Sequence, residues 1–348
     1  MREILETCVR FDELANQVYL DLKTRCGDTE VAVLMGKMAV EEASHVVWWR
    51  ELVEAWDGGL LPDLWPDSSD IVKTLEAAVT ELASLVPSDG SPIEAEHALT
   101  TAARLEFFAL DPIFGQLIDL TEPEVGRTRH TAYDGHVDRL IDAVAAAFAP
   151  GTTQGFLAQV LRRAQQDNKV LAHFATHDPL TGLGNRRALS AQAAQWTAWA
   201  ARYGHALSFL LLDVDRFKRV NDRHGHVSGD RALKALAETI AGSIRSADLA
   251  SRYGGDEFAV LAPELGPSGA RELAQRVLEA VRQLRITAAD GTEIGLTVSI
   301  GIATVFDPPD SEPRKVDELL AAADRSLYAA KLSGRGRVAD PVLLTRAS

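Results

Sequence analysis

Within the second half of this chain lies the sequence Arg252-Tyr253-Gly254-Gly255-Asp256-Glu257-Phe258. The runs on either side of it are rich in β-forming residues, which predicts two strands joined by a tight turn. Paired glycines adopt backbone conformations that other residues avoid, and they let a ligand approach the main chain closely. Asp256 and Glu257 follow at once. The pattern is either a plain hairpin with solubilising acids or a hairpin that binds a ligand.

A second acidic motif, Asp213-Val214-Asp215, ends the apolar run 206–213. Because side chains alternate along a strand, Asp213 and Asp215 face one way and Val214 the other. Carboxylates at a strand end, where α/β sheets bind ligands, suit a hard divalent cation such as Mg²⁺, which often shares its oxygen ligands with phosphate. Solvated surface acids also explain this motif taken alone. A hairpin carboxylate beside Asp213 would complete a metal site.

The region after Asp178 alternates between strand and helix patterns, which predicts an α/β domain with helices on a central sheet. Strands are expected at 206–213, on both sides of the glycine turn and at 296–303. Helices are expected at 231–244, 269–284 and 316–332.

From Asp178 to Val338 the chain resembles the GGDEF domains of diguanylate cyclases, which condense two GTP molecules into cyclic di-GMP. Four motifs in the family's order carry the resemblance: Asp178-Pro179-Leu180-Thr181-Gly182-Leu183-Gly184-Asn185-Arg186-Arg187, Asp213-Val214-Asp215-Arg216-Phe217-Lys218-Arg219-Val220-Asn221-Asp222, Gly225-His226-Val227-Ser228-Gly229-Asp230 and Gly254-Gly255-Asp256-Glu257-Phe258. The resemblance implies a nucleotidyl-cyclase-like fold with a central, mostly antiparallel sheet.

The resemblance also implies the residues of the reaction. Mg²⁺ or Mn²⁺ is expected on the carboxylate of Asp213, the backbone carbonyl of Val214 and Asp256. The expected catalytic residues are Asp256, as proton acceptor, and Glu257, which helps to place metal and nucleotide. The 3′-hydroxyl of one GTP attacks the α-phosphorus of the other and expels pyrophosphate.

Substrate contacts follow from the same motifs. Asn221 and Asp230 match the guanine-recognising residues, and an amide with a carboxylate complements the edge of that base. The expected phosphate contacts are Lys218, Lys331 and Arg335. The chain departs from the family at Gly336, where Asn is usual, and this puts the local loop geometry in question.

Feedback and dimerisation are implied as well. An Arg-x-x-Asp motif, Arg245 to Asp248, lies where the family's product-inhibition site lies, and Arg276 matches its secondary arginine; a solvated ion pair is the simpler alternative. Because each domain holds one GTP, two domains must face each other in a homodimer. Residues 151–177 space apolar positions as a short coiled coil with Asn168 at a core position, or form a single amphipathic linker helix.

Residues 1–150 predict an all-α bundle. Apolar residues recur at helical spacing over 4–22, with Leu5, Val9, Leu14, Val18 and Leu22 as the expected buried stripe. Further helices are expected at 30–56, 71–85, 92–110 and 129–148.

The bundle weakly resembles the ferritin-like, rubrerythrin-type fold. Glu42 and His45 lie three residues apart on one helix face, a spacing used by di-iron bundles. The resemblance implies a metal site, with iron as a candidate, and this set of ligands: Glu13, Glu42, His45, Glu106 and His136. Tyr133 occupies the position of one expected acid, so the site is altered, mononuclear or lost. Scattered polar residues of an acidic bundle are the alternative.

Charge and cysteine content limit the classes of function and location that are expected for this chain. Residues 1–150 hold 28 acidic and 11 basic side chains, a balance of −17, whereas residues 151–348 hold 22 and 25, a balance of +3. Such a chain is unsuited to DNA or RNA. Cys8 and Cys26 are too few for a disulfide framework, and no leader or 18-residue apolar run occurs, so a cytoplasmic protein without membrane contact is expected.

The sequence therefore predicts four parts: a helical sensor (1–150), a linker (151–177), a diguanylate cyclase domain (178–340) and a tail (341–348). The expected function is a homodimeric, Mg²⁺-dependent diguanylate cyclase, with GTP as substrate and cyclic di-GMP as feedback ligand. It would be regulated by a sensor that responds to redox state or oxygen. Two alternatives stay open: a non-catalytic receptor for GTP or cyclic di-GMP, and a di-iron oxidoreductase with a regulatory GGDEF domain.

Overall fold

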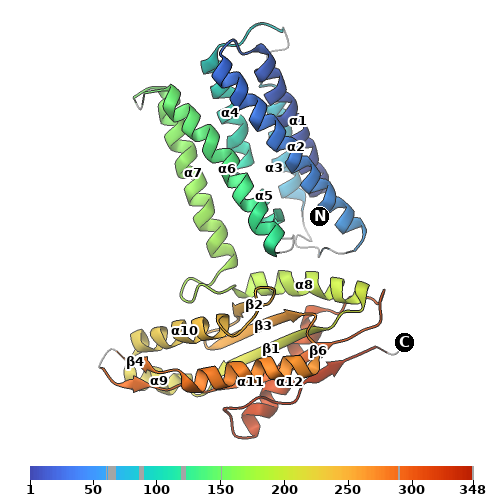
Figure 1. Ribbon diagram of the computed structural model, residues 1–348, viewed down its shortest axis with the longest axis vertical. Helices are drawn as coiled ribbons and strands as arrows, with labels where there is room; N and C mark the ends of the chain where they lie inside the picture. Colours follow the sequence, from blue (N-terminus) through green and yellow to red (C-terminus); the bar gives the residue numbers. More distant parts are fainter. Residues whose placement is uncertain are drawn as a thin grey trace. The chain divides into compact units, whose positions relative to one another are not determined.

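The computed structural model describes residues 1–59, 61, 68–85, 90–118, 123–149, 151–288 and 291–346 (Figure 1). The chain divides into two compact units, Met1–Ala172 and His173–Ser348. The division falls later than the boundary expected at residue 150, which itself lies outside the described residues. Most of the expected linker therefore belongs to the first unit.

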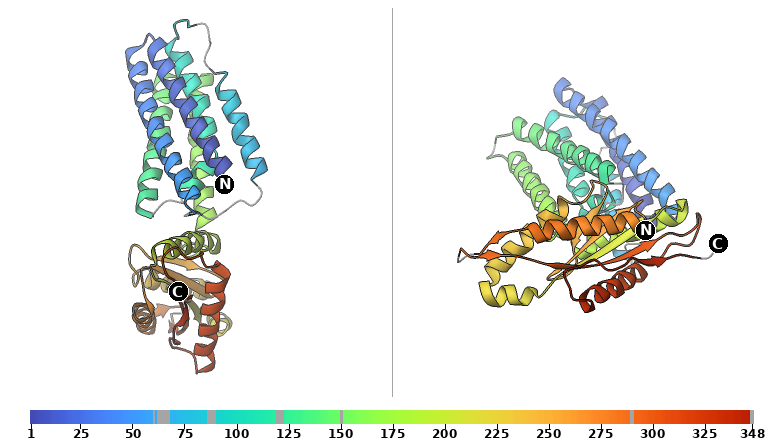
Figure 2. Two further views of the ribbon diagram at one scale, coloured as in Figure 1. Left: turned by 90° about the vertical axis from the view of Figure 1, so that its right-hand side faces the viewer. Right: turned by 60° about the horizontal axis from the view of Figure 1, so that its bottom comes forward.

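The first unit is helical, as expected, and its helices run side by side (Figures 1 and 2). They are α1 (Arg2–Arg25), α2 (Thr29–Asp57), α3 (Ser69–Leu82), α4 (Ala95–Ala109), α5 (Pro112–Ile118), α6 (Pro123–Ala147) and α7 (Thr153–Thr176). At the start of α2 the Asp28 carboxylate accepts a hydrogen bond from the Val31 amide (3.0 Å), a favourable N-cap. The helices enclose one core, which includes Trp49, Tyr19 and Phe114.

The buried stripe of α1 differs from the expected one. Val9 and Leu14 are only partly buried, whereas Cys8, Asp12 and Ala15 face the core. Positions 8, 12 and 15 are spaced by four and three residues, so they share one helix face. The core face of α1 is thus rotated toward Asp12.

The helix α7 packs against the bundle over part of its length. Ala158 and Leu161 are buried in the bundle core, and the Asn168 side chain donates to the carbonyl of Leu110. Asn168, expected at the core of a coiled coil, therefore has a partner within this unit. Leu171, farther along the same seam, is 58% exposed.

The second unit is an α/β domain with a five-stranded sheet of order β2-β3-β1-β6-β7. The strands are β1 (Leu207–Val214), β2 (Leu249–Arg252), β3 (Glu257–Pro263), β6 (Val298–Val305) and β7 (Val342–Leu344). All pairs are antiparallel except β6 with β7, so the sheet is mostly antiparallel, as expected. A small separate pair joins β4 (Ile286–Thr287) to β5 (Glu293–Ile294). The segment expected as a tail thus contributes the edge strand β7.

Helices cover both faces of this sheet. Side chains of α10 (His226–Ala241) and α11 (Pro267–Gln283) form one core with the sheet, while α8 (Arg186–Tyr203) and α12 (Val316–Leu332) form the other. Along β1, Leu210 and Leu212 face the first core, and Phe209 and Leu211 face the second. This explains the apolar run 209–212 within β1. The short helix α9 (Phe217–His224) follows β1.

None of the described helices combines the length and the apolar character that a membrane span needs.

Candidate functional site

The two acidic motifs meet at the end of β1. Asp213 and Glu257 are register partners in the antiparallel pair β1–β3, and the Val214 amide donates to the Asp256 carbonyl at 3.1 Å. The hairpin closes through the Tyr253 amide, which donates to the Glu257 carbonyl at 2.8 Å. A Cβ at position 254 would lie 2.6 Å from Glu257 Oε2, so a larger residue there would displace the Glu257 carboxylate. The fold thus brings Asp213, Asp256 and Glu257 together.

These acids outnumber the cation beside them. Lys331 Nζ, from α12, lies 2.8 Å from Asp213 Oδ2. Burial raises the pKa of Asp213, Lys331 opposes the shift, and the charges of Asp256 and Asp215 reinforce it, so the pKa is raised overall. Burial and then the Asp213 charge also raise the pKa of Glu257. A partly buried acidic cluster of this kind favours a divalent cation.

Asp215, which faces the same way, organises a neighbouring turn. Its carboxylate accepts hydrogen bonds from Ser299 Oγ (2.7 Å), Thr297 Oγ1 (2.9 Å) and the Gly336 amide (2.9 Å). Gly336 has a φ of +59°, a left-handed conformation that glycine and asparagine adopt readily. Glycine at position 336 is therefore compatible with this turn. The alternation of β1 indicated the direction of Asp215 but not its three donors.

The residues expected to contact the nucleotide lie on α9, on α10, at the end of α12 and in the turn after it. Asn221, on α9, is partly buried, and its Oδ1 is buried without a hydrogen-bond partner next to Gly229 of α10. Asp230, Lys218 and Arg335 are exposed. A buried amide oxygen without a partner is costly, so it is suited to receive a donor from a ligand. Lys331, expected on phosphate, pairs instead with Asp213 here.

The expected feedback site is a short loop before β2. The Arg245 amide donates to Asp248 Oδ2 (2.9 Å), and Arg276 Nε, from α11, donates to the Ser243 carbonyl (2.9 Å). The guanidinium group of Arg245 is exposed. The three residues are therefore parts of one surface region.

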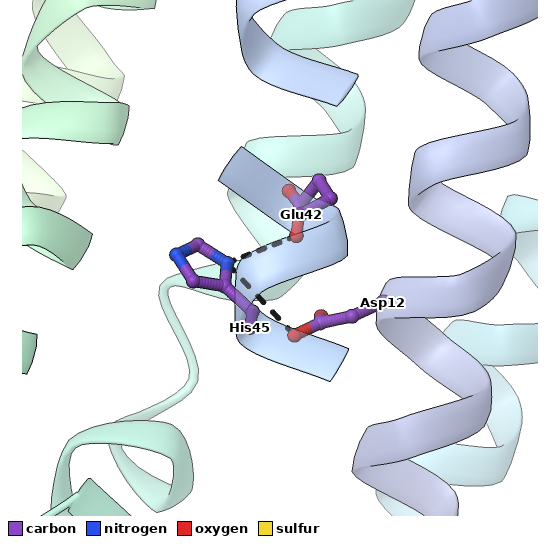
Figure 3. A group of neighbouring side chains, drawn as sticks. All are labelled: Asp12, Glu42 and His45. Carbon is purple, nitrogen blue, oxygen red and sulfur yellow. Dashed lines mark hydrogen bonds and ion pairs between the residues drawn. The ribbon is translucent and has the colours of Figure 1, made fainter. Parts of the chain in front are cut away.

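A second cluster of chemically active residues is buried in the helical unit (Figure 3). Two groups can each hold a metal ion, with ligand atoms within 4.8 Å of one another: Asp12, Glu42 and His45 in one, and Glu42, Glu106 and His136 in the other. Four of the five expected ligands are thus brought together.

The fifth expected ligand, Glu13, lies outside both groups. Its carboxylate is turned outward and pairs with Arg50 (2.5 Å), while the neighbouring Asp12 points toward His45 (Figure 3). The signal available in the sequence was the spacing of Asp12 from Cys8 and Ala15, which places it on the apolar face. Tyr133 lies beside the cluster, with its ring centroid 5.2 Å from that of His45.

Burial and neighbouring charges shift the pKa values of this cluster in different directions. Burial raises the pKa of Asp12 well above its usual value, and Glu42 adds to the rise. Burial alone would raise the pKa of Glu42, but His136 and His45 outweigh it and lower the value to about 2. Burial alone would lower the pKa of His136, but Glu106 and Glu42 raise it well above the usual value. The neighbouring carboxylates thus favour the protonated form of His136.

The second unit is thus an α/β domain with a mostly antiparallel sheet and an acidic cluster at the end of β1. Residues 175–337 match the family model described as "Diguanylate cyclase, GGDEF domain". This part of the chain is a GGDEF domain, homologous to diguanylate cyclases.

Individual relatives share this region. Diguanylate cyclase DosC of Escherichia coli (strain K12) is 39% identical over 170 residues, which cover 49% of this chain and 36% of that protein. Diguanylate cyclase TpbB of Pseudomonas aeruginosa (strain UCBPP-PA14) is 38% identical over 175 residues, covering 50% and 39%. The GGDEF domain of DgcB from Caulobacter crescentus, solved in complex with c-di-GMP, is 31% identical with a TM-score of 0.44, covering 48% of this chain and 95% of that chain. The chain thus spans under half the length of the curated relatives named.

Proposed function

We propose that the protein is a diguanylate cyclase that converts two GTP molecules into cyclic di-GMP and pyrophosphate. The observation that carries the proposal is the meeting of Asp213, Asp256 and Glu257 at the end of β1, within a GGDEF domain. Homologous diguanylate cyclases share this domain.

The acidic residues fit a hard divalent cation. Asp213, Asp256 and the carbonyl of Val214 would hold Mg²⁺ or Mn²⁺, which neutralises phosphate charge when bound. Asp256 is the proposed acceptor of the proton from the attacking 3′-hydroxyl, and Glu257 positions metal and nucleotide. Lys331, Lys218 and Arg335 supply positive charge for the triphosphate. Asn221 and Asp230 bind guanine, and a site built this way rejects adenine because its polar groups would stay unpaired.

Joining two nucleotides requires two GGDEF domains face to face, so we propose a homodimer. The helix α7 supports this, since Phe156, Val170, Leu171 and Phe174 on it are each more than half exposed. Exposed apolar side chains at this density favour association with a second copy. Sedimentation velocity of the full chain tests the assembly, and a monomer at all concentrations that support turnover would contradict it.

Feedback by cyclic di-GMP at Arg245, Asp248 and Arg276 belongs to the same proposal. Exposed arginines match both phosphate and the guanine edge. The free thiols Cys8 and Cys26 and the requirement for GTP support a cytoplasmic location.

The assay is incubation of the full chain with GTP and Mg²⁺, followed by chromatography of the nucleotides. Cyclic di-GMP and pyrophosphate are expected from the wild type. Asp256→Asn should lower the rate at least about 100-fold, as expected for loss of an acid–base group. Asp317→Asn, an exposed acid at the start of α12, is the matched control. Binding of GTP without turnover would instead favour the receptor alternative.

We further propose that the helical unit regulates this activity through bound metal, with iron as the candidate and redox state or oxygen as the signal. The buried cluster around Glu42 supports it. Cyclase activity compared before and after removal of metal, with Mg²⁺ restored, tests the coupling. An oxidoreductase function would show itself as consumption of oxygen by the iron-loaded chain.

A further inference from the structure

Glu42 occupies a shared position between two sets of ligands. Its Oε2 lies 3.0 Å from His45 Nδ1, and its Oε1 lies 3.1 Å from His136 Nε2. The two oxygens of one carboxylate therefore face two different imidazoles. The imidazole rings are close, with centroids 5.3 Å apart. A carboxylate placed in this way could bridge two metal ions, one beside each imidazole.

The two groups that share Glu42 have the same composition. Asp12, Glu42 and His45 form one, and Glu106, Glu42 and His136 form the other, so each offers two carboxylates and one imidazole. In the first group, Asp12 Oδ2 lies 3.9 Å from His45 Nδ1; in the second, Glu106 Oε1 lies 2.8 Å from His136 Nε2. Each group would supply three side-chain ligands to a metal ion, fewer than the four that close a structural zinc site.

The groups around the cluster hold the ligands in place. The Trp49 indole donates to Asp12 Oδ2 (2.5 Å), and the Tyr19 hydroxyl donates to Glu106 Oε1 (2.5 Å). His136 Nδ1 lies 2.8 Å from Glu41 Oε2. A proton kept between these two atoms would leave His136 Nε2 free to bind a metal ion in place of its own proton, as carboxylates behind metal-binding histidines do.

The buried carboxylates of the cluster provide a second, independent observation. Glu106 is fully buried, and its Oε2 has no hydrogen-bond partner. Asp12 and Glu42 are at most 3% exposed. Among the described residues, the ion pairs of these three carboxylates come from His45 and His136 alone. Buried carboxylates in excess of their cations are costly, and a cation relieves that cost.

We propose that the helical unit binds two divalent first-row transition-metal ions, bridged by the carboxylate of Glu42. Asp12 and His45 complete one site, and Glu106 and His136 the other. Two divalent ions carry four positive charges against three carboxylates, which leaves the buried site close to neutral. Mixed oxygen and imidazole ligands favour Fe²⁺, Mn²⁺, Co²⁺ or Zn²⁺ over Mg²⁺ and Ca²⁺. The inference deepens the proposed regulatory metal function and rests on it for its biological role.

Co²⁺ is the probe for the test, because its visible absorption and its magnetism report ligands and neighbours. The full chain is stripped of metal with a chelator, titrated with Co²⁺ in excess Mg²⁺, and its bound cobalt is counted by elemental analysis. The double variant Asp213→Asn/Asp256→Asn removes the proposed cyclase metal ligands. Two bound ions per chain are expected in this variant, with magnetic coupling between them. Zero or one ion in a chain that retains its helical circular dichroism would overturn the proposal.

The variants that follow are made in that double-variant background. His45→Gln should reduce the count from two to one. Glu42→Gln should remove the magnetic coupling, and unchanged coupling would refute the bridge. Glu13→Gln is the matched control, because its carboxylate is exposed one residue from Asp12, and it should keep both ions. If Glu42→Gln does not fold, the ion count of the parent and of His45→Gln still decides. The count does not depend on turnover, so a chain that makes no cyclic di-GMP but binds two ions refutes the cyclase proposal alone.

Discussion

Replacing Gly229 with alanine should weaken GTP binding while leaving the GGDEF domain folded. A Cβ at this position would lie 3.0 Å from Asn221 Cγ, closer still to its Oδ1, and 3.3 Å from Phe217 Cζ. Ordinary contacts of a Cβ begin near 3.4 Å, so the Asn221 amide must move away. The Oδ1 that is displaced is the buried atom without a partner, which we assign to guanine.

The size of the effect follows from that atom. Losing one hydrogen bond and leaving the partner group unpaired costs about 1–3 kcal/mol, which corresponds to a roughly 5- to 150-fold rise in the Kd for GTP. The stability of the domain should change little, because alanine gains about 1 kcal/mol over glycine within a helix and offsets part of the crowding at Phe217. A change in Tm of a few degrees is expected.

The measurement is GTP binding by calorimetry in Ca²⁺, which avoids turnover, together with KM for cyclic di-GMP formation and the thermal melting curve. Gly266→Ala is the matched control: Gly266 precedes α11 with φ −77°, and a Cβ there would meet nothing within 4 Å. An unchanged Kd and KM in a folded Gly229→Ala protein would refute the assignment of Asn221. If Gly266→Ala lost GTP binding as well, the loss in Gly229→Ala would not come from the contact between the new Cβ and Asn221.

Other regions of the GGDEF unit carry further predictions. Arg245→Ala should raise the cyclic di-GMP concentration for half-maximal inhibition at least about tenfold, since a hydrogen bond to a charged group is worth about 1.5–3 kcal/mol; equal inhibition of both proteins would contradict a feedback site there. Gly301→Ala should destabilise the unit by about 2–3 kcal/mol, because the Cβ would lie 2.7 Å from Leu327 Cα, and an unaltered urea midpoint would exclude this packing. Hydrogen bonding to Arg314 lowers the pKa of Asp307, so the stabilisation is present above the unfolded pKa near 4 and is lost as the pH falls through the lower folded pKa. Asp307→Asn should therefore cost about 1–2 kcal/mol at neutral pH and lose that difference in strong acid, and stability curves that stay parallel with pH would rule it out.

Much of the GGDEF domain was predictable because its motifs are local. The apolar run 207–212 ends in two acids, and the glycine pair of the hairpin precedes two more, so strand, turn and acidic site all followed from short sequences. The pairing of Asp213 with Lys331 was not predictable, since it joins residues 118 positions apart through the packing of α12. The donors to Asp215 from Ser299, Thr297 and Gly336 likewise come from distant segments.

In the helical unit, local periodicity identified the helices and the Glu42–His45 pair, because residues three apart share a helix face whatever lies around them. It did not distinguish Asp12 from Glu13. Consecutive residues of a helix differ by about 100° in direction, and which of them enters the core depends on how neighbouring helices pack. One carboxylate oxygen of Glu42 lies near His45 and the other near His136, an arrangement that arises where α2 meets α6. It is therefore a property of the packed bundle and not of any one segment.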